Sequence, residues 1–335
     1  ELQAAIPEDA IVFFEDVDFE YLKETVIPES RFWLDFLKIS NENSLDSMLN
    51  ALLFQLASSE PLHKLLLSDG FSFSLHKIGK DQLVPLFYLE YSGLHSDHEF
   101  ENILLALLEE KAMINDRKYE AKVVYDVSGG PGFFAGTFTF GCLDGICLLS
   151  ISSMLVEEAI RTIHGESNLA NDAGLKKVNA TRGRYVHANV FLNYSRLDEL
   201  LHPLLRESVW GKIAGLSGVA SWGELDLDIK QEAITLNGMT YADPDLPLFL
   251  GAFSEQSPVK MEIHEILPSG ISYFQHVGIS HKEVFREQVL SYLDALGLRA
   301  ELNAEVERIE KAYGFNPVND LVQILDDEMA WFAID

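Results

Sequence analysis

The feature that most constrains the fold is a tight turn between two short apolar segments, Phe140-Gly141-Cys142-Leu143 and Ile146-Cys147-Leu148. The turn itself is Asp144-Gly145, a dipeptide that favours a type I′ turn because both central residues need a positive φ. The segment therefore predicts an antiparallel β-hairpin in which Leu143 faces Ile146 and Cys142 faces Cys147. A sheet that contains such a hairpin is at least partly antiparallel.

The two cysteines of the chain are Cys142 and Cys147. Facing each other in a non-hydrogen-bonded pair, they would have Cα atoms about 4.5 Å apart, which is within reach of a disulfide. The alternative is two small thiols buried in the sheet, where free cysteine is common. Two cysteines without a nearby histidine supply only half of a tetrahedral ligand set, so no metal site is predicted there.

Other segments repeat the pattern of strands joined by short turns. Phe71, Phe73 and Leu75 alternate with Ser72, Ser74 and His76, which predicts a half-buried strand paired with Leu83–Tyr91. A single strand is expected over Tyr119–Val127. Helices are expected over Leu45–Ala57 and Asp97–Lys111, the second opened by a Ser96–Glu99 capping box. Because hairpins dominate and regular βαβ alternation is absent, the expected fold class is α+β, with antiparallel sheets covered by helices.

The second half of the chain begins like the first. Ala188-Asn189-Val190-Phe191-Leu192 matches Ala10-Ile11-Val12-Phe13-Phe14, 178 positions earlier. Strands are then expected over Glu224–Ile229, Glu232–Tyr241, Val259–Leu267 and Ile271–Gly278, and a second capping box over Ser280–Glu283. We therefore expect two related α+β units at residues 1–165 and 184–299, joined by a polar linker at 166–183. Residues 300–335 are expected to form a helical connection and the start of a truncated further unit.

The chain is strongly acidic, with a formal net charge of −28. Nucleic acids and anionic lipid headgroups are bound by positively charged surface, so neither is an expected partner. The longest uncharged segment, Val127–Leu143, is rich in glycine and is not expected to insert into a membrane. The partner is expected to be a protein or a small molecule.

Three carboxylates share one face of a predicted strand: Glu224, Asp226 and Asp228. Paired carboxylates can act as acid and base in glycoside hydrolysis. The residues between them, Leu225 and Leu227, are apolar, so the favoured interpretation is an ordinary solvated strand face.

Histidine and tryptophan side chains were the remaining candidates for a site. His76, His187 and His264 fall on the polar phase of predicted strands and are expected to be exposed. His95 and His98 are explained by their place at a helix start, and the glycine-rich loop Ser128–Gly132 by a turn, since no helix follows it. All four tryptophans (Trp33, Trp210, Trp222 and Trp331) are expected in the core. No catalytic, cofactor-binding or metal-binding residue is predicted.

A resemblance rests on the strand openings Ile6–Phe13 and Tyr185–Leu201, the Asp144-Gly145 hairpin and the segment Pro247–Leu267. These segments resemble an uncharacterised family of bacterial envelope proteins, a domain of unknown function. The resemblance implies an N-terminal membrane anchor before Glu1 and an extracytoplasmic region built from a repeated α+β unit. It carries no known site. With the first residue being Glu1 and an apolar strand at the last residues, we expect a fragment of a longer protein.

The favoured function is a non-catalytic, exported envelope protein, periplasmic or surface-exposed, that acts as a binding or assembly module without a cofactor. Two alternatives stay open: a hydrolase with a site assembled from scattered residues, and a small-molecule or lipid carrier that uses an apolar pocket.

Overall fold

The computed structural model describes residues 2–18, 21, 71–80, 82–91, 96–108, 112–129, 137–165, 168–204, 215–230, 233–324 and 326–334. The expected helix Leu45–Ala57, Trp33, Trp210, His95 and most of the glycine-rich loop lie outside these residues. The chain divides into two compact units. Unit 1 consists of Glu1–Ala214 and Trp222–Tyr241, and unit 2 of Gly215–Ser221 and Ala242–Asp335.

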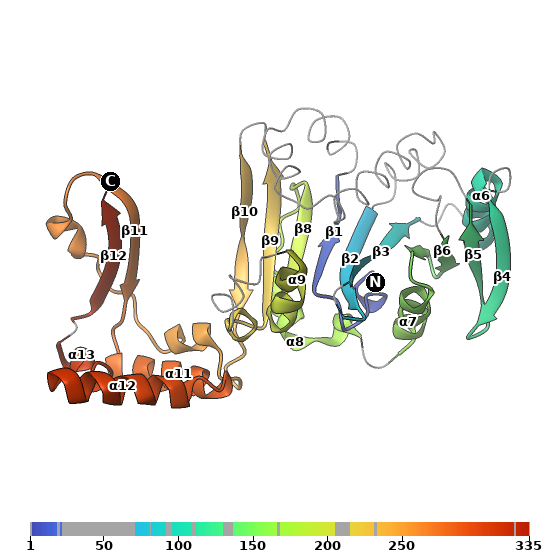
Figure 1. Cartoon of the computed structure of the whole chain (residues 1–335). Helices are drawn as coiled ribbons and strands as arrows, with labels where there is room; N and C mark the ends of the chain where they lie inside the picture. The colour runs from blue at the N-terminus through green and yellow to red at the C-terminus, as the bar shows by residue number, and fades with distance from the viewer. Residues whose placement is uncertain are drawn as a thin grey trace. The chain divides into compact units, whose positions relative to one another are not determined.

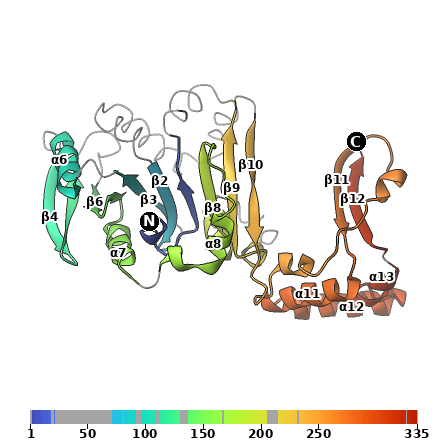
Figure 2. The same cartoon turned by 180° about the vertical axis from the view of Figure 1, so that it is seen from behind.

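Unit 1 is built on one ten-stranded sheet in which every pair of neighbours is antiparallel (Figures 1 and 2). The strand order is β10-β9-β8-β1-β2-β3-β7-β6-β5-β4. The strands are β1 (Val12–Glu15), β2 (Phe71–Ile78), β3 (Gln82–Glu90), β4 (Met113–Tyr119), β5 (Lys122–Ser128), β6 (Thr137–Leu143), β7 (Ile146–Ser150), β8 (Ala188–Asn193), β9 (Trp222–Ile229) and β10 (Ile234–Tyr241). The α+β class is thereby confirmed, with one shared sheet in place of two separate ones.

Both faces of this sheet are buried in its middle, whereas the edge strands β10 and β4 are largely exposed. On one face, which we name the α6 face, strand residues pack with Phe100, Leu104 and Leu108 of helix α6 (Asp97–Leu108). On the opposite face, the α7 face, they pack with α7 (Ser153–Ile163) and α8 (Ala173–Asn179). Successive side chains of a strand point to opposite faces. A strand in the middle of this sheet therefore has no solvated side, and the polar residues of β2 are buried, contrary to expectation.

The remaining local elements of unit 1 are η1 (Leu2–Ala4), η4 (Leu169–Asn171), η5 (Tyr194–Arg196) and α9 (Leu197–Leu204). The capping box at the start of α6 is confirmed, because the Glu99 backbone N–H donates to Ser96 Oγ at 3.3 Å and the Ser96 N–H donates to Glu99 Oε2 at 3.0 Å. The expected single strand over Tyr119–Val127 is instead a hairpin of β4 and β5. Its turn, Glu120-Ala121, has positive φ at both residues without the glycine that usually marks such a turn.

The structure divides the chain elsewhere than expected. Residues 166–183 were expected to be a linker, but Leu169, Leu175 and Val178 from this stretch are buried in the core of the α7 face. Strands β8, β9 and β10 then extend the same sheet as β1–β7. The buried apolar positions of this stretch could not be recognised from the sequence, because its helices, η4 and α8, are too short to show a clear periodicity.

Unit 2 holds a two-stranded antiparallel sheet of β11 (Ile271–Gly278) and β12 (Glu328–Ile334). Its other elements are η6 (Leu216–Gly218), η7 (Phe249–Phe253), η8 (Ile263–Ile266), α11 (Lys282–Ala295), α12 (Arg299–Tyr313) and α13 (Asn319–Ile324). Two expectations are corrected here. The predicted strand Val259–Leu267 contains η8. Helix α11 is preceded by His281 without a side-chain cap, and Ser280 Oγ accepts from the Ser257 N–H instead. The last strand, β12, pairs with β11.

Candidate functional site

A cluster of acidic and amide side chains lies on the α7 face, where strands β1, β8 and β9 run side by side. Glu15 is directly opposite Asn189, which is directly opposite Asp226, so the three form a row across the sheet. Glu224 lies two residues before Asp226 on the same face of β9. Arg182 approaches from the loop before β8, and its Nη1 is 2.7 Å from Glu15 Oε2. We name these five residues the acidic cluster.

Asp226 is held in place by two donors. The Gly183 backbone N–H donates to Asp226 Oδ1 at 2.7 Å, and Asn189 Nδ2 donates to the same oxygen at 2.9 Å. A Cβ atom at Gly183 would lie 2.6 Å from Asp226 Oδ2, so a larger residue here would displace the Asp226 carboxylate. The backbone of the loop that carries Arg182 is thus bonded directly to the sheet.

The two glutamates of the acidic cluster are withdrawn from water. Glu15 is 3% exposed and Glu224 is 0% exposed. Among the described residues, Glu15 Oε1 and both carboxyl oxygens of Glu224 have no hydrogen-bond partner. Burial raises the pKa of Glu15 to about 7, although Gln3 and Arg182 act in the opposite direction. Burial and the neighbouring Asp226 carboxylate raise the pKa of Glu224 to about 7. Both carboxyl groups therefore exchange protons near neutral pH.

The expectation of a solvated strand face is wrong for Glu224. It agrees better with Asp228, which lies further along β9 and is partly exposed. Asp228 is 36% exposed in its side chain and pairs with Lys230 at 2.8 Å and with His187 at 3.2 Å. His187 is partly shielded, and Tyr21 stacks on it with ring centroids 3.9 Å apart. Sequence periodicity placed these carboxylates on one face correctly but could not show that other elements cover one end of that face.

The chemistry open to the acidic cluster is proton binding. Among the described residues, no group of three or more His, Cys, Asp or Glu side chains has the geometry to hold a metal ion. A glycoside hydrolase needs its two carboxyl groups to reach a sugar from opposite sides of the scissile bond. Glu224 has no exposed surface through which a sugar could approach.

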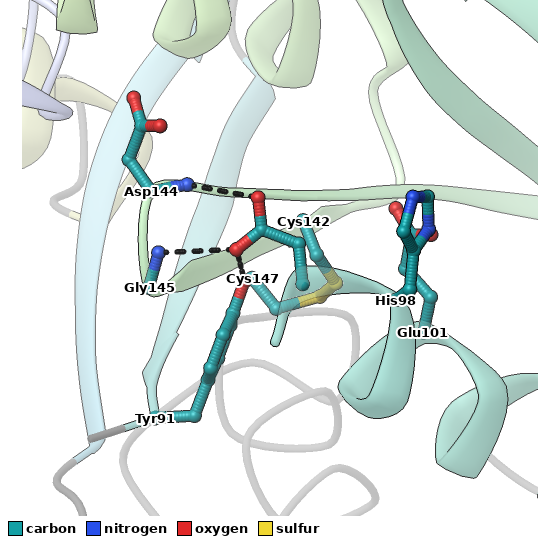
Figure 3. The surroundings of a disulfide bond; sticks show 8 residues. Tyr91, His98, Glu101, Cys142, Asp144, Gly145 and Cys147 are labelled. Carbon is teal, nitrogen blue, oxygen red and sulfur yellow. Dashed lines mark hydrogen bonds and ion pairs between the residues drawn. A yellow bond between two sulfur atoms is a disulfide. The ribbon is translucent and has the colours of Figure 1, made fainter. Parts of the chain in front are cut away.

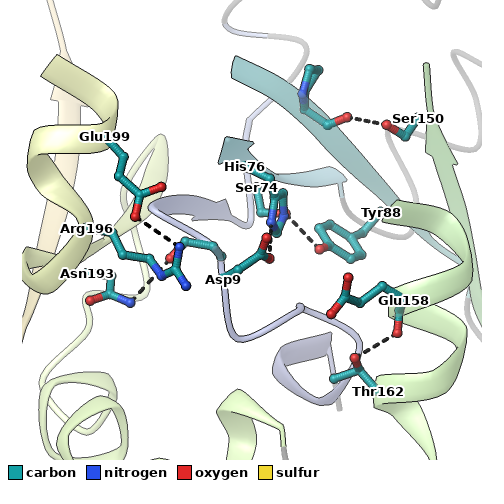
Figure 4. Close-up of polar contacts among 12 residues, drawn as sticks. Asp9, Ser74, His76, Tyr88, Ser150, Glu158, Thr162, Asn193, Arg196 and Glu199 are labelled. Atoms are coloured by element: carbon teal, nitrogen blue, oxygen red, sulfur yellow. Dashed lines mark hydrogen bonds and ion pairs between the residues drawn. The ribbon is translucent and has the colours of Figure 1, made fainter. Parts of the chain in front are cut away.

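A second polar group on the α7 face is a hydrogen-bonded chain of four side chains (Figure 4). Asp9 Oδ1 lies 2.7 Å from His76 Nδ1, and His76 Nε2 lies 2.6 Å from Ser74 Oγ. Tyr88 Oη is 2.8 Å from the same Ser74 oxygen. Burial opposes ionisation of Asp9, but the hydrogen bond and charge of His76 outweigh it, so the pKa of Asp9 is lowered. Burial raises the pKa of Tyr88. We name this group the buried polar chain.

The buried polar chain has the connectivity of a nucleophile, its base and an orienting carboxylate. Its surroundings differ from those of a catalytic serine. Ser74, His76 and Tyr88 are each 0% exposed, and Ser74 lies in the middle of the sheet between Phe13 and Leu86. The expectation that His76 is exposed is wrong, because the polar phase of β2 faces the interior and its polar atoms bond to one another. His264, by contrast, is exposed.

The Asp144-Gly145 hairpin has the predicted register, with Cys142 opposite Cys147 and their Cα atoms 4.0 Å apart. The two sulfur atoms form a disulfide within the core of the α6 face (Figure 3). The turn is tied to α6 by Asp97, whose carboxylate accepts from Tyr91 Oη at 2.6 Å and from the N–H groups of Asp144 and Gly145 at 3.3 and 3.4 Å. Burial alone would raise the pKa of Asp97, but these donors lower it.

The two-stranded sheet of unit 2 exposes large apolar side chains. Both strands contribute, and their exposed fractions are 54% for Tyr273, 37% for Phe274, 47% for Trp331, 46% for Phe332 and 56% for Ile334. Tyr273 and Trp331 lie on one face of this sheet, and Phe274 and Phe332 lie on the other. We name the five residues together the aromatic surface. The expectation that Trp331 lies in the core is wrong, whereas Trp222 is buried as expected. The helices of unit 2 also line a partly open, mostly apolar cavity of about 260 Å³, whose lining residues include Phe285, Val289, Leu293 and Leu302.

No family model, curated protein or solved structure matches this chain. Glu15 and Glu224 of the acidic cluster and Ser74, His76 and Tyr88 of the buried polar chain are buried within unit 1, whereas the aromatic surface is exposed to solvent. Among the described residues, no helix is both long enough and apolar enough to cross a bilayer.

Proposed function

We propose that this chain is a non-catalytic binding or assembly module of an exported envelope protein, and that unit 2 makes the contact with its partner. The observation that carries the proposal is the aromatic surface. Aromatic side chains dominate the energetics of protein interfaces, and large exposed apolar patches mark interaction sites.

The small core of unit 2 supports this proposal. The described apolar residues that are fully buried in unit 2 are Ala220, Ala252 and Ile279, and two of these are alanines. A two-stranded sheet is marginally stable unless a third strand or a packed layer covers it. A partner that covers β11 and β12 would supply the burial that unit 2 lacks.

The disulfide supports export to the periplasm or the cell surface. Disulfides persist in oxidising compartments and are rare in the cytosol. Cys142 and Cys147 are both buried, so the bond is a structural element of the sheet. An exported location also agrees with the resemblance to bacterial envelope proteins.

We also propose that unit 1 contains two related units. Strands β1, β2 and β3 are consecutive neighbours in the sheet, and so are β8, β9 and β10. The two sets meet where β1 pairs with β8. Phe13 and Phe191, which correspond in the 178-residue alignment, lie directly opposite each other in that pair. This is the arrangement expected of two copies of one motif related by a local two-fold axis.

Site-specific photocrosslinking in cells tests the binding function. A photoreactive phenylalanine analogue replaces Trp331 in one variant, and in the control it replaces Tyr185, which is 99% exposed in unit 1. We expect a crosslinked product on irradiation of the Trp331 variant and none from the control. Equal crosslinking at both positions, or none at Trp331, would show that the aromatic surface is not a specific contact.

A hydrolase is the second candidate, favoured by the connectivity of the buried polar chain. It requires unit 1 to open so that Ser74 becomes accessible. A fluorophosphonate probe should then label the wild-type protein and leave Ser74→Ala unlabelled. If the folded wild type is not labelled while a known serine hydrolase, the positive control, is labelled, the hydrolase hypothesis is refuted and the binding function remains.

A carrier is the third candidate, favoured by the apolar cavity between the helices of unit 2. Its volume of about 260 Å³ is just below the 300–1,000 Å³ that ligand pockets usually have, so a short acyl chain is the largest plausible occupant. Titration with decanoate, followed by fluorescence of a displaced hydrophobic dye, tests it. Leu293→Trp would fill the cavity and should abolish any binding.

A further inference from the structure

We infer that two copies of this chain associate by antiparallel pairing of β11 with β11 of the second copy. The product is a continuous four-stranded sheet with the order β12-β11-β11-β12. This inference rests on the proposed function, because it names the partner of the surface through which unit 2 makes contact.

Unit 1 already contains such a sheet within one chain. The next described strand after β1 is β2, and the next after β8 is β9; each following strand is the antiparallel neighbour of the one before it. The two leading strands, β1 and β8, then pair with each other in antiparallel fashion, which gives the order β2-β1-β8-β9. In unit 2, β11 and the next strand β12 are likewise antiparallel neighbours. Among the described residues, the outer edge of β11 has no paired strand. A second copy would place an identical leading strand there.

The sequence of β11 lacks the devices that keep edge strands apart. Exposed edges are usually protected by charged residues or proline. Strand β4, which is an edge of the sheet in unit 1, carries Asp116, Arg117 and Lys118. Strand β11 reads Ile-Ser-Tyr-Phe-Gln-His-Val-Gly and contains neither an acidic residue, a lysine, an arginine nor a proline. Its outer edge is therefore open to hydrogen bonding with another strand.

Low charge favours self-pairing at β11, although edge strand β10 of unit 1 is also uncharged. Two copies with a net charge of −28 repel each other over most of their surface. Strands β11 and β12 together contain one acidic residue, Glu328, and His276 Nε2 lies 2.9 Å from its carboxylate. Two β11 strands can approach without bringing carboxylates together. The remaining long-range repulsion is screened by salt, so the dimer should strengthen as ionic strength rises.

Side-chain chemistry favours the same arrangement. Tyr273 and Gln275 share one face of β11, where Tyr273 Oη donates to Gln275 Oε1 at 2.8 Å. Phe274 lies on the opposite face, across from Phe332 of β12. Both faces of the two-stranded sheet are therefore apolar in part, and a four-stranded sheet would double the width of each. Cross-strand pairs of aromatic residues stabilise a sheet.

Sedimentation velocity of the full chain tests the inference at 20 mM and 500 mM salt. We expect a monomer–dimer equilibrium that shifts toward dimer at the higher salt concentration. Tyr273→Glu and Tyr273→Lys should each weaken the dimer by about ten-fold or more, because the two paired β11 strands then carry like charges. Mixing these two variants should restore association, since the paired strands then carry opposite charges. Tyr313→Glu, at a position in unit 2 that is 78% exposed and outside the sheet, is the matched control and should dimerise like the wild type.

Four outcomes would overturn the inference. The wild type could remain monomeric at both salt concentrations. The two Tyr273 variants could dimerise as well as the wild type while circular dichroism shows them folded. Their mixture could fail to associate. Leu236→Glu, on the uncharged edge strand β10, could abolish the dimer instead. If Trp331 crosslinks in cells to a chain of different mass while the purified protein is monomeric, self-pairing is refuted and the binding function stands.

Discussion

Phe13 of β1 and Phe191 of β8 lie opposite each other at the centre of the ten-stranded sheet, with their rings stacked 4.6 Å apart between centroids. Trp222 contacts the edge of this pair, with a ring centroid 6.1 Å from that of Phe13. Both phenylalanines are 0% exposed. The stack joins the strands that the first and second halves of the chain contribute to the sheet.

Truncation of this stack should destabilise unit 1 strongly. Phe13→Ala and Phe191→Ala are each expected to lower the free energy of unfolding by about 3–5 kcal/mol, because each leaves a buried cavity. The double variant should lose less than the sum, since the two rings contact each other. Urea unfolding measures the changes. Tyr185→Ala, at a 99% exposed position, should have a free energy of unfolding within about 0.5 kcal/mol of the wild-type value. If Tyr185→Ala destabilises the protein as much as the phenylalanine variants do, the stack is not a special source of stability.

The acidic cluster should make unit 1 more stable in mild acid than at neutral pH. The pKa of Glu15 is raised from 4.5 to about 7 in the folded state, so the folded protein binds the proton more tightly than the unfolded chain. The free energy of unfolding must then fall as pH rises from about 4.5 to about 7, by on the order of 3 kcal/mol for this residue. Glu224 acts in the same direction.

Glu15→Gln and Glu224→Gln should each flatten this pH dependence and stabilise the protein at pH 8. Urea unfolding at pH 5, 6, 7 and 8 measures the effect. Glu120→Gln, in the exposed β4–β5 turn, is the matched control and should keep the wild-type slope. A wild-type stability that rises between pH 5 and 7 would contradict the assignment.

Loss of the imidazole from the buried polar chain should also be costly. His76→Ala removes the imidazole that pairs with Asp9 and one of the two hydrogen-bond partners of Ser74, which keeps Tyr88, and it leaves a cavity at a fully buried position. We expect a loss of roughly 2–3 kcal/mol in the free energy of unfolding. His264→Ala, at an exposed position, serves as control. If His76→Ala is as stable as the control variant, the hydrogen-bonded chain does not hold the strand in place.

The disulfide should resist chemical modification in the native protein. Cys142 and Cys147 are buried, so neither should react with iodoacetamide until the protein is both unfolded and reduced. The bond closes a loop with a sequence separation of 5, for which chain entropy predicts a stabilisation of about 2 kcal/mol. Urea unfolding with and without reductant measures it. Immediate alkylation of both thiols in freshly isolated protein would argue against export.

The hairpin at Asp144-Gly145 and the capping box at Ser96–Glu99 were predictable because each depends on residues next to one another in the sequence. The turn at Glu120-Ala121 was missed because neither residue carries a turn signature, and only pairing of β4 with β5 reveals it. The acidic cluster was half predictable. Glu224 and Asp226 follow from strand alternation, whereas Glu15 and Arg182 come from distant segments that meet them only in the folded sheet.

The amino-acid sequence by itself determined most of the local elements of this protein: many of its strands, its best-marked turns and caps, and a net charge of −28. These depend on backbone preferences and side-chain periodicity over a few residues. The tertiary structure decided which side chains meet water. His76 and Glu224 lie on the polar side of strands with alternating sequences, where exposed side chains are expected, yet helices and neighbouring strands bury both. Tryptophan is a residue type expected in a core, yet the two-stranded sheet that contains Trp331 has no covering layer among the described residues. Burial depends on contacts between distant segments, and periodicity along one strand does not encode them.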